Sequence, residues 1–429
     1  MKKITTLLTA IIGMALMNQV SATHVTVEVP TAGQLSSLVQ DVNCDSITIS
    51  GNLDGNDFWF IREQMPNLVY LNTSKVTVPG NRLPESGLYS KKTLQKIILP
   101  DNLETIGNHA FAYCSNLKNV TFPKSLVTIE YNVFYQSGLS EVVLPENLKE
   151  IEDGVFYECY SLKKVTFPKT LVTIGNNAFR QCSLSEIALS DSLKTIGNNA
   201  FRYCQQLQKV TFPEKLEAIG TYAFSDCFRL HTTTLKGKTA PAISDNTFNY
   251  TKVFYVPEGA AQTYKEASNW SNLVIIDGNT PKKITVTLTT AGTLGEEILK
   301  QVDYVKQVNE LVINGPLNSD DFYQIQQQAT NLISIDLTKA TIESLPENFF
   351  YERAALLDIK LPATLKSIGR NAFYRCYGLT QITIPEGVTS IKDHSFYQCL
   401  SLKEIKLPSS LTEIQEYTFQ ECKSLESIE

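Results

Sequence analysis

The chain of 429 residues carries 43% hydrophobic and 19% charged side chains, enough apolar material for one large core or two ordinary domains. This composition excludes disordered, collagenous and coiled-coil chains. With 38 Lys and Arg against 44 Asp and Glu, the net charge is −6, which argues against a nucleic-acid partner.

Residues 1–22 have the three-part layout of a secretory signal peptide. A basic start at Lys2 and Lys3 precedes an apolar stretch from Leu7 to Met17, and small residues around Ala22 suit cleavage. The apolar stretch is shorter than the roughly 20 residues of a membrane span, which disfavours an anchor. We therefore expect an exported chain, secreted or held at the cell surface, with no transmembrane segment in the mature form.

Residues 23–93 are expected to form an N-terminal capping module, and a repeat of 22 or 23 residues follows. One copy, starting at Leu162, reads LKKVTFPKTLVTIGNNAFRQCS. The constant period predicts a leucine-rich solenoid over residues 94–235, in which each coil buries its apolar face against its neighbours. The copies start, with steps of 23, 22, 23, 22, 23 and 23, at Leu94, Leu117, Leu139, Leu162, Leu184, Leu207 and Leu230.

Within one coil, Leu162 to Phe167 predicts a short strand, and Pro168 ends it because proline cannot donate to a continuing ladder. Leu171 to Ile174 predicts a second extended piece, and Gly175 to Asn177 a turn. Phe179 then lies at the start of a brief helical or irregular segment that completes the coil. Its copies predict an internal row, which we interpret as a core ladder rather than a ligand groove. The row contains Phe111, Phe134, Phe156, Phe179, Phe201 and Phe224, and later Phe373, Phe396 and Phe419.

The whole arrangement occurs twice. Residues 284–355 are expected to form a second capping module, because they repeat positions of the first. Matching pairs include Gly33 and Gly292, Gly51 and Gly315, and Asp57 and Asp321. Coils starting at Leu356, Leu379, Leu402 and Leu425 predict a second array over residues 356–429, apparently truncated. Residues 236–277 are expected to form a closing cap of the first array and residues 278–283 a linker.

Eight of the nine cysteines occupy one register, three residues after the ladder phenylalanine. An exported chain would normally suggest disulfides. Copies in parallel coils point the same way, however, so the spacing favours a column of buried thiols that act as small hydrophobes. The column contains Cys114, Cys159, Cys182, Cys204, Cys227, Cys376, Cys399 and Cys422, and Cys44 lies outside it.

The coil pattern Leu-x-x-Ile/Val-x-Leu/Phe-Pro-x-x-Leu-x-x-Ile-Gly-x-x-Ala-Phe-x-x-Cys resembles the BspA-type leucine-rich repeats of bacterial surface proteins. The opening module, with Asp57 and the run Asn67 to Leu71, is similar to those of secreted Bacteroidales proteins. Ser137 in place of Cys and Ser190 in place of Pro are minor departures. The resemblance implies an α/β-type, mainly β solenoid with a role in surface binding or adhesion. It implies no catalytic residues and no particular ligand.

The candidate binding face consists of outward-pointing strand positions together with aromatic side chains that we expect to be exposed. Opposite charges alternate along this face, and parallel strands about 4.8 Å apart place them next to each other, which avoids repulsion. The candidate residues are Lys96, Lys118, Glu141, Lys163, Lys164, Glu186 and Lys209, with Tyr113, Tyr135, Tyr157 and Tyr203.

These patterns predict a non-enzymatic surface protein that binds a protein or glycan on a host or neighbouring cell. The main alternative is a structural spacer or surface-coat component whose lysines only keep the sheet soluble. A remote alternative is a glycan-active enzyme using Glu141 and Glu186, which two strand steps would place roughly 9–10 Å apart. Lys164 between them would hold both ionised, which is wrong for a general acid. No catalytic, cofactor or metal motif is expected, since the four histidines share no ligand spacing.

Overall fold

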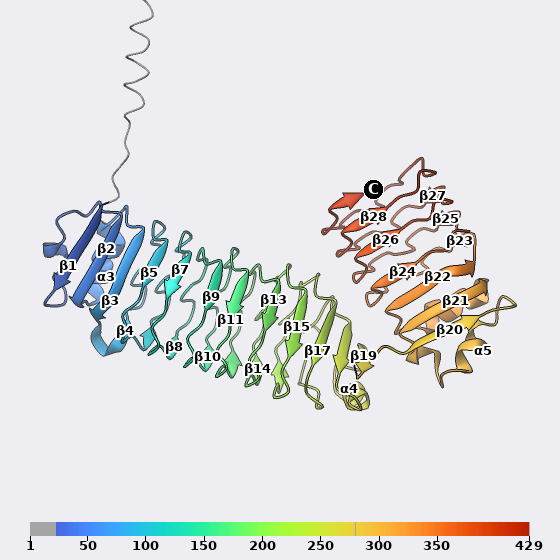
Figure 1. Ribbon diagram of the computed structural model, residues 1–429, viewed down its shortest axis with the longest axis horizontal. Coiled ribbons are helices and arrows are strands. Elements are labelled where there is room, and N and C mark those ends of the chain that lie inside the picture. Colours follow the sequence, from blue (N-terminus) through green and yellow to red (C-terminus); the bar gives the residue numbers. More distant parts are fainter. Residues whose placement is uncertain (1–22, 279, 429) are drawn as a thin grey trace, which may run out of the picture.

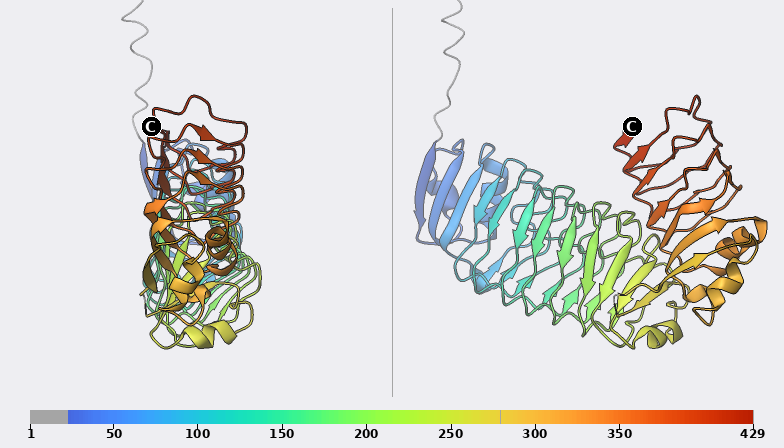
Figure 2. Two further views of the ribbon diagram at one scale, coloured as in Figure 1. Left: turned by 90° about the vertical axis from the view of Figure 1, so that its right-hand side faces the viewer. Right: turned by 45° about the vertical axis from the view of Figure 1, so that its right-hand side comes forward.

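The computed structural model describes residues 23–278 and 280–428, which form a parallel-strand solenoid of two arrays. The second array turns back from the end of the first (Figures 1 and 2). The predicted solenoid is confirmed. The expected signal peptide, residues 1–22, lies outside the described residues, as does Asn279 of the expected linker. In the described part of the chain, no helix is both long and apolar enough to cross a membrane.

A typical coil contains a long strand of two to four residues, a short strand of two residues and a turn segment. The coils of β17 and β28 have no short strand. The turn segment runs from the end of the short strand to the cysteine position, as in residues 175–182. The opening module contains β1 (His24–Val29), α2 (Leu35–Leu38), β2 (Ser46–Asn52), α3 (Gly55–Gln64), β3 (Tyr70–Thr77), η1 (Pro79–Asn81) and β4 (Arg82–Leu83).

The long strands of the first array are β5 (Lys96–Ile98), β7 (Asn119–Thr121), β9 (Glu141–Val143), β11 (Lys164–Thr166), β13 (Glu186–Ala188), β15 (Lys209–Phe212) and β17 (Thr232–Leu235). The short strands are β6 (Thr105–Ile106), β8 (Thr128–Ile129), β10 (Glu150–Ile151), β12 (Thr173–Ile174), β14 (Thr195–Ile196) and β16 (Ala218–Ile219). The closing segment holds β18 (Val253–Val256), α4 (Ala261–Glu266) and β19 (Val274–Asp277).

The second half starts with β20 (Lys283–Thr287), α5 (Leu294–Leu299), η2 (Val305–Gln307), β21 (Glu310–Pro316), α6 (Ser319–Tyr323), η3 (Gln324–Gln328) and β22 (Ser334–Thr341). Its long strands are then β24 (Asp358–Lys360), β26 (Gln381–Thr383), β28 (Glu404–Lys406) and β29 (Ser427–Ile428). Its short strands are β23 (Ser344–Leu345), β25 (Ser367–Ile368) and β27 (Ser390–Ile391). The long strands of both arrays face the viewer in Figure 1.

The opening module and the closing segment continue the sheet of the first array. Leu71 of β3 pairs with Ile97 of β5, and Phe254 of β18 pairs with Thr233 of β17. One hydrophobic core accordingly runs from Val27 to Ile275, and a second core runs from Ile284 to Ile405.

The residues shared by the two opening modules are linked by hydrogen bonds. The buried carboxylate of Asp57 accepts from the backbone N–H groups of Gly33 at 2.7 Å, Leu35 at 2.9 Å and Asp54 at 2.9 Å. Asp321 holds the matching loop in the second module through Gly292 N at 2.7 Å. One carboxylate therefore ties a loop to the start of a helix in each module, which explains why these positions recur together.

The phenylalanine row is a core ladder, as expected. Each of the six rings of the first array is at most 1% exposed, and neighbouring centroids lie 5.2–5.4 Å apart in stacked geometry. Phe167, directly after the long strand β11, meets Phe179 edge-on at 5.6 Å across the core. The long strand and the turn segment therefore present their outward side chains on opposite sides of the coil.

The cysteine column consists of unpaired thiols, as predicted. Each Sγ donates to a backbone carbonyl of the preceding coil, as in Cys182 to Phe156 O at 3.2 Å and Cys204 to Phe179 O at 3.1 Å. Burial raises the pKa of the Cys204 thiol to about 12. The thiols thus join adjacent coils without covalent bonds.

The two arrays contact each other through the corners that follow the cysteine positions. Ser401 Oγ donates to Phe228 O at 2.7 Å, and Arg229 Nε donates to Ser424 Oγ at 3.3 Å. The rings of Tyr250 and Tyr377 meet at 4.8 Å. A small apolar cluster of Val253, Val274, Ile276 and Ile333 continues this contact to the junction between the halves.

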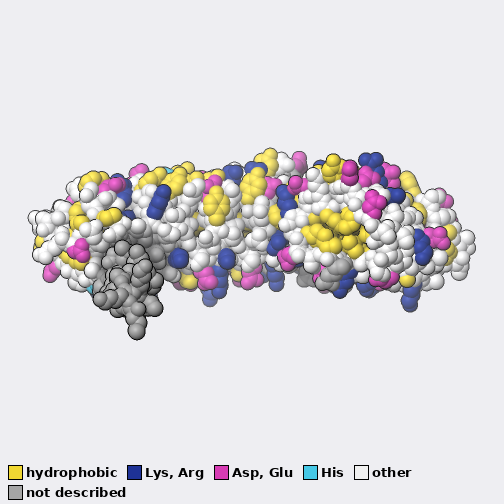
Figure 3. All heavy atoms as spheres, turned by 90° about the horizontal axis from the view of Figure 1, so that it is seen from above, with side chains coloured by type: hydrophobic (Ala, Val, Ile, Leu, Met, Phe, Trp, Pro, Cys, Tyr) yellow, Lys and Arg dark blue, Asp and Glu magenta, His cyan; other side chains and the backbone are white. Residues whose placement is uncertain are grey.

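At the other end of the second array, the core is less well covered. Phe419, Cys422 and Leu425 are only partly buried, whereas Ile414 and Ile428 are exposed. Figure 3 shows a compact hydrophobic patch on the upper surface, above these last coils. Elsewhere on that surface, charges of both signs are interspersed.

Candidate functional site

The seven charged candidates are all exposed on or directly before the long strands. Glu141 of β9 stands opposite Lys164 of β11, and Glu186 of β13 stands opposite Lys209 of β15. The expected alternation therefore places opposite charges in register on paired strands, where cross-strand neighbours attract.

The long strands do not form one continuous sheet. Within the described residues, the ladder ends between β7 and β9, between β11 and β13, and between β24 and β26. Parallel strands need their hydrogen bonds evenly spaced along the ladder, so a small displacement of one coil breaks them. The strand-lined face is therefore divided into blocks.

A shorter corner precedes the strand at each break in the first array. Ser137 and Leu139 are separated by one residue, as are Cys182 and Leu184, whereas other corners of this array have two residues between these positions. Gly138 approaches the preceding coil so closely that a Cβ would lie 2.2 Å from Ser115 O. These are the steps of 22 residues. The break between β24 and β26 follows a corner of full length, so corner length is not the only cause.

A groove lies at each of the three breaks. The groove between β7 and β9 has a volume of about 720 Å³, and those between β11 and β13 and between β24 and β26 each have about 490 Å³. The sequence contained a signal for the first two, namely the alternation of 22 and 23 residues, but periodicity alone does not show that a short corner opens the sheet.

The β7–β9 groove combines an apolar lining with a charged rim. Val120, Phe122 and Leu144 contribute to the lining, and Lys124 and Glu141 to the rim. Val143 also lines it and is 70% exposed, an unusual state for valine in a strand. This groove can receive an apolar group of a partner while the rim binds polar groups.

The carboxylates of the remote enzyme alternative line different grooves. Glu141 lines the β7–β9 groove, whereas Glu186 lines the β11–β13 groove together with Lys164, Lys209 and Lys236. A glycosidase needs both carboxyl groups around one scissile bond, so this arrangement offers no catalytic pair.

The four tyrosines differ from the expectation in exposure and position. Tyr113, Tyr135, Tyr157 and Tyr203 are half-buried rather than exposed, and they lie on turn segments rather than beside the long strands. Tyr113, Tyr135 and Tyr157 pack ring to ring in neighbouring coils at 5.0–5.2 Å. The expectation that these tyrosines are exposed members of the binding face is therefore wrong, because the turn segment crosses the opposite side of each coil.

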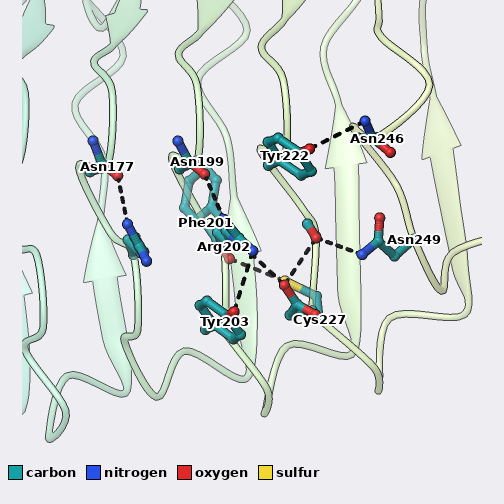
Figure 4. A network of polar contacts seen from close by, with 12 residues as sticks. Asn177, Asn199, Phe201, Arg202, Tyr203, Tyr222, Cys227, Asn246 and Asn249 are labelled. Atoms are coloured by element: carbon teal, nitrogen blue, oxygen red, sulfur yellow. Dashed lines mark hydrogen bonds and ion pairs between the residues drawn. The ribbon is translucent and has the colours of Figure 1, made fainter.

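Arginines continue this row in the next two coils, and sequence reasoning missed them. Arg180 lies between the rings of Tyr157 and Tyr203, at 5.2 Å and 5.7 Å from their centroids. Arg202 lies over Tyr203 and Tyr222, at 4.8 Å and 4.9 Å. Figure 4 shows Asn199, Arg202 and Tyr203 together on one turn segment, with Tyr222 and Cys227 on the next coil. The sequence did carry a signal for them, because the residue directly after the ladder phenylalanine changes from Tyr to Arg between the coil of Tyr157 and the coil of Arg180.

Comparisons with known proteins identify the repeat. The family model described as BspA type leucine rich repeat region matches in six copies, over residues 82–187, 128–255, 172–285 and 323–429. No curated protein matches the sequence.

Several solved structures are similar to this chain. A leucine-rich cell surface protein from Faecalibacterium prausnitzii is 24% identical, covering 89% of this chain and 83% of that one with a TM-score of 0.35. A leucine-rich repeat protein from Bacteroides ovatus is 21% identical, covering 84% and 86% with a TM-score of 0.32. A leucine-rich repeat protein from T. pallidum is 26% identical, covering 38% and 78% with a TM-score of 0.34.

Proposed function

Because the chain belongs to the BspA-type leucine-rich repeat family, we propose that it is an exported, non-enzymatic cell-surface protein that binds an extended protein or glycan partner. The partner would lie across the long strands of the first array. Proteins of this repeat type commonly act at cell surfaces, and a stack of coils offers the long face that an extended partner requires.

The β7–β9 groove is the observation that carries this proposal. It is the largest of the three grooves at the strand breaks, and its lining leaves Val143 exposed. Exposed apolar surface surrounded by polar groups is typical of interaction sites. Lys163 and Lys164, one coil further along, would add charge-assisted contacts and faster association.

The test is a binding measurement with matched variants. The mature chain is immobilised and exposed to a panel of extracellular matrix proteins, glycans and neighbouring cells. Val143→Asp introduces a charge into the groove, while Val127→Asp is the control, because Val127 is 47% exposed and lies outside all three grooves. A second variant reverses the charges of Lys163 and Lys164.

Saturable binding that falls with Val143→Asp and with the charge reversal, but not with Val127→Asp, would support the proposal. Equal losses in all three variants would contradict this face as the site. No binding to any panel member, combined with self-assembly, would favour the spacer. Hydrolysis of a glycan that disappears in Glu141→Gln or Glu186→Gln would establish an enzyme instead.

A further inference from the structure

Two neighbouring arginines on the turn segments differ in how their charges are compensated. Arg202 donates from Nε to Asp226 Oδ2 at 3.1 Å, from Nη1 to Asn199 Oδ1 at 3.4 Å and from Nη2 to the hydroxyl of Tyr203 at 3.3 Å. Within the described chain, the guanidinium of Arg180 has one hydrogen bond, from Nη1 to Asn177 Oδ1 at 3.5 Å. Its Nε is buried and has no partner there.

The sequence explains the difference. Arg180 and Arg202 each follow a ladder phenylalanine, and the residue that faces them comes from the next coil. That residue is Asp226 for Arg202, but it is Tyr203 for Arg180. Arg180 therefore lies between two tyrosine rings with no carboxylate within ion-pair distance in the described part of the chain.

A guanidinium has five N–H donors in a planar fork, and most of those of Arg180 are unused. Ring contacts hold the cation in place but do not satisfy its N–H groups. The side chain is only half-buried, so a ligand can reach it. We propose that Arg180 is the centre of a second binding site, which takes the carboxylate of an acidic glycan.

The surroundings favour a glycan over an acidic peptide. Asn177 and Gln181 offer amide groups for sugar hydroxyls, and Tyr157 and Tyr203 offer aromatic surface. Burial alone would raise the pKa of Glu158, but hydrogen bonds from Gln136 and three tyrosines lower it, so this carboxylate stays ionised nearby. A ligand with closely spaced carboxylates would be repelled by Glu158, whereas a sugar chain with isolated carboxylates between hydroxyl-rich units fits one uncompensated cation.

This site is separate from the proposed binding face. The turn segments and the long strands present outward side chains on opposite sides of each coil, as the contact between Phe167 and Phe179 requires. A partner on the β7–β9 groove and a glycan at Arg180 can therefore bind independently, and substitutions at one site should leave the other unchanged.

The probes are sialyllactose and a hyaluronan oligosaccharide, which carry their carboxylates on different sugars, with lactose as the neutral control and a poly-glutamate peptide as the peptide alternative. Affinities are measured by calorimetry on the mature chain. Arg180→Met removes the cation. Tyr203→Asp keeps the cation but places a carboxylate beside it, as Asp226 does for Arg202. Aspartate suits this position, since Tyr203 and Asp226 share a φ near +62°.

Arg375→Met is the matched control. Arg375 also packs on a tyrosine, Tyr374 at 5.1 Å, but it is ion-paired with Glu352 at 2.9 Å. We expect one or both acidic glycans to bind in preference to lactose, and Arg180→Met and Tyr203→Asp each to weaken this binding tenfold or more. Arg375→Met and Val143→Asp should change it less than twofold.

The two acidic sugars distinguish a sialic acid from a uronic acid as the natural source of the carboxylate. The proposal is overturned if neither acidic glycan binds more tightly than lactose, or if Arg375→Met weakens binding as much as Arg180→Met. Tighter binding of poly-glutamate would show a peptide site instead. If Arg180→Met does not fold, the affinity of Tyr203→Asp for the acidic glycans alone tests the proposal, because this variant retains the arginine.

Discussion

Replacing Phe179 by alanine tests whether the phenylalanine row is the core of the first array. The ring is fully buried, stacks on Phe156 at 5.2 Å and on Phe201 at 5.3 Å, and meets Phe167 edge-on at 5.6 Å. Phe→Ala in a packed core costs about 3–5 kcal/mol. Three aromatic contacts of about 0.5–1.5 kcal/mol each place Phe179→Ala in the upper part of that range, at about 4 kcal/mol.

Urea unfolding followed by tryptophan fluorescence suits this measurement. The chain has two tryptophans, and both lie in its first half. Trp270 is fully buried in the first core, whereas Trp59 is 50% exposed on α3. With a slope of about 3 kcal/mol/M, a loss of about 4 kcal/mol lowers the midpoint by somewhat more than 1 M. Tyr160→Ala is the control, because Tyr160 is 55% exposed on a nearby corner and its loss should stay within about 0.5 kcal/mol. Equal midpoints for the two variants, or a loss below about 1 kcal/mol for Phe179→Ala, would refute the ladder as a source of stability.

Three further predictions concern buried polar groups. Asp57→Ala should lower the unfolding midpoint markedly, since each of three N–H groups loses its acceptor at about 1–3 kcal/mol, and calorimetry against Asp54→Ala would show whether the loop or the cap dominates. Burial holds the pKa of Cys204 near 12 instead of its ordinary 9, so stability is complete below pH 9 and declines as pH rises toward 12, and iodoacetamide should label the folded chain slowly at pH 8. Burial, with the charges of Lys403 and Arg229, lowers the pKa of His231 to about 4. The contact between the arrays should therefore weaken as pH falls from 6.5 to 4, and small-angle scattering would detect this change. The pH dependence should disappear in His231→Gln.

Local patterns were sufficient for the features that repeat in every coil. Leu162 to Phe167, Pro168 and Gly175 encode a strand, its end and a turn, because these depend on neighbouring residues and on stacking the same unit. The cysteine column was also predictable, since equal registers in parallel coils point their side chains the same way. For the same reason, the exposure of Lys164 and Glu141 followed from their strand positions.

Features that depend on how coils are displaced or on which segments meet were not readable in this way. The exposure of Tyr157 and Tyr203 was misjudged, because the turn segment packs its residues against the coils on both sides. The isolation of Arg180 becomes visible only when the facing residue of the next coil is known to be Tyr203. The contact of Phe228 with Ser401 joins residues 173 positions apart, and no local rule relates them.

Length and composition, together with the repeat, determined that this chain is a solenoid with two arrays and buried ladders of phenylalanine and cysteine. The tertiary structure decided where the sheet opens, which side chains share a face and where the arrays touch. The physical reason is that burial within a coil follows from sequence spacing, whereas a groove or an uncompensated charge arises from the offset of one coil against the next. The ladder ends between β7 and β9, and the only sign of this break in the sequence is a corner that is one residue shorter than its neighbours.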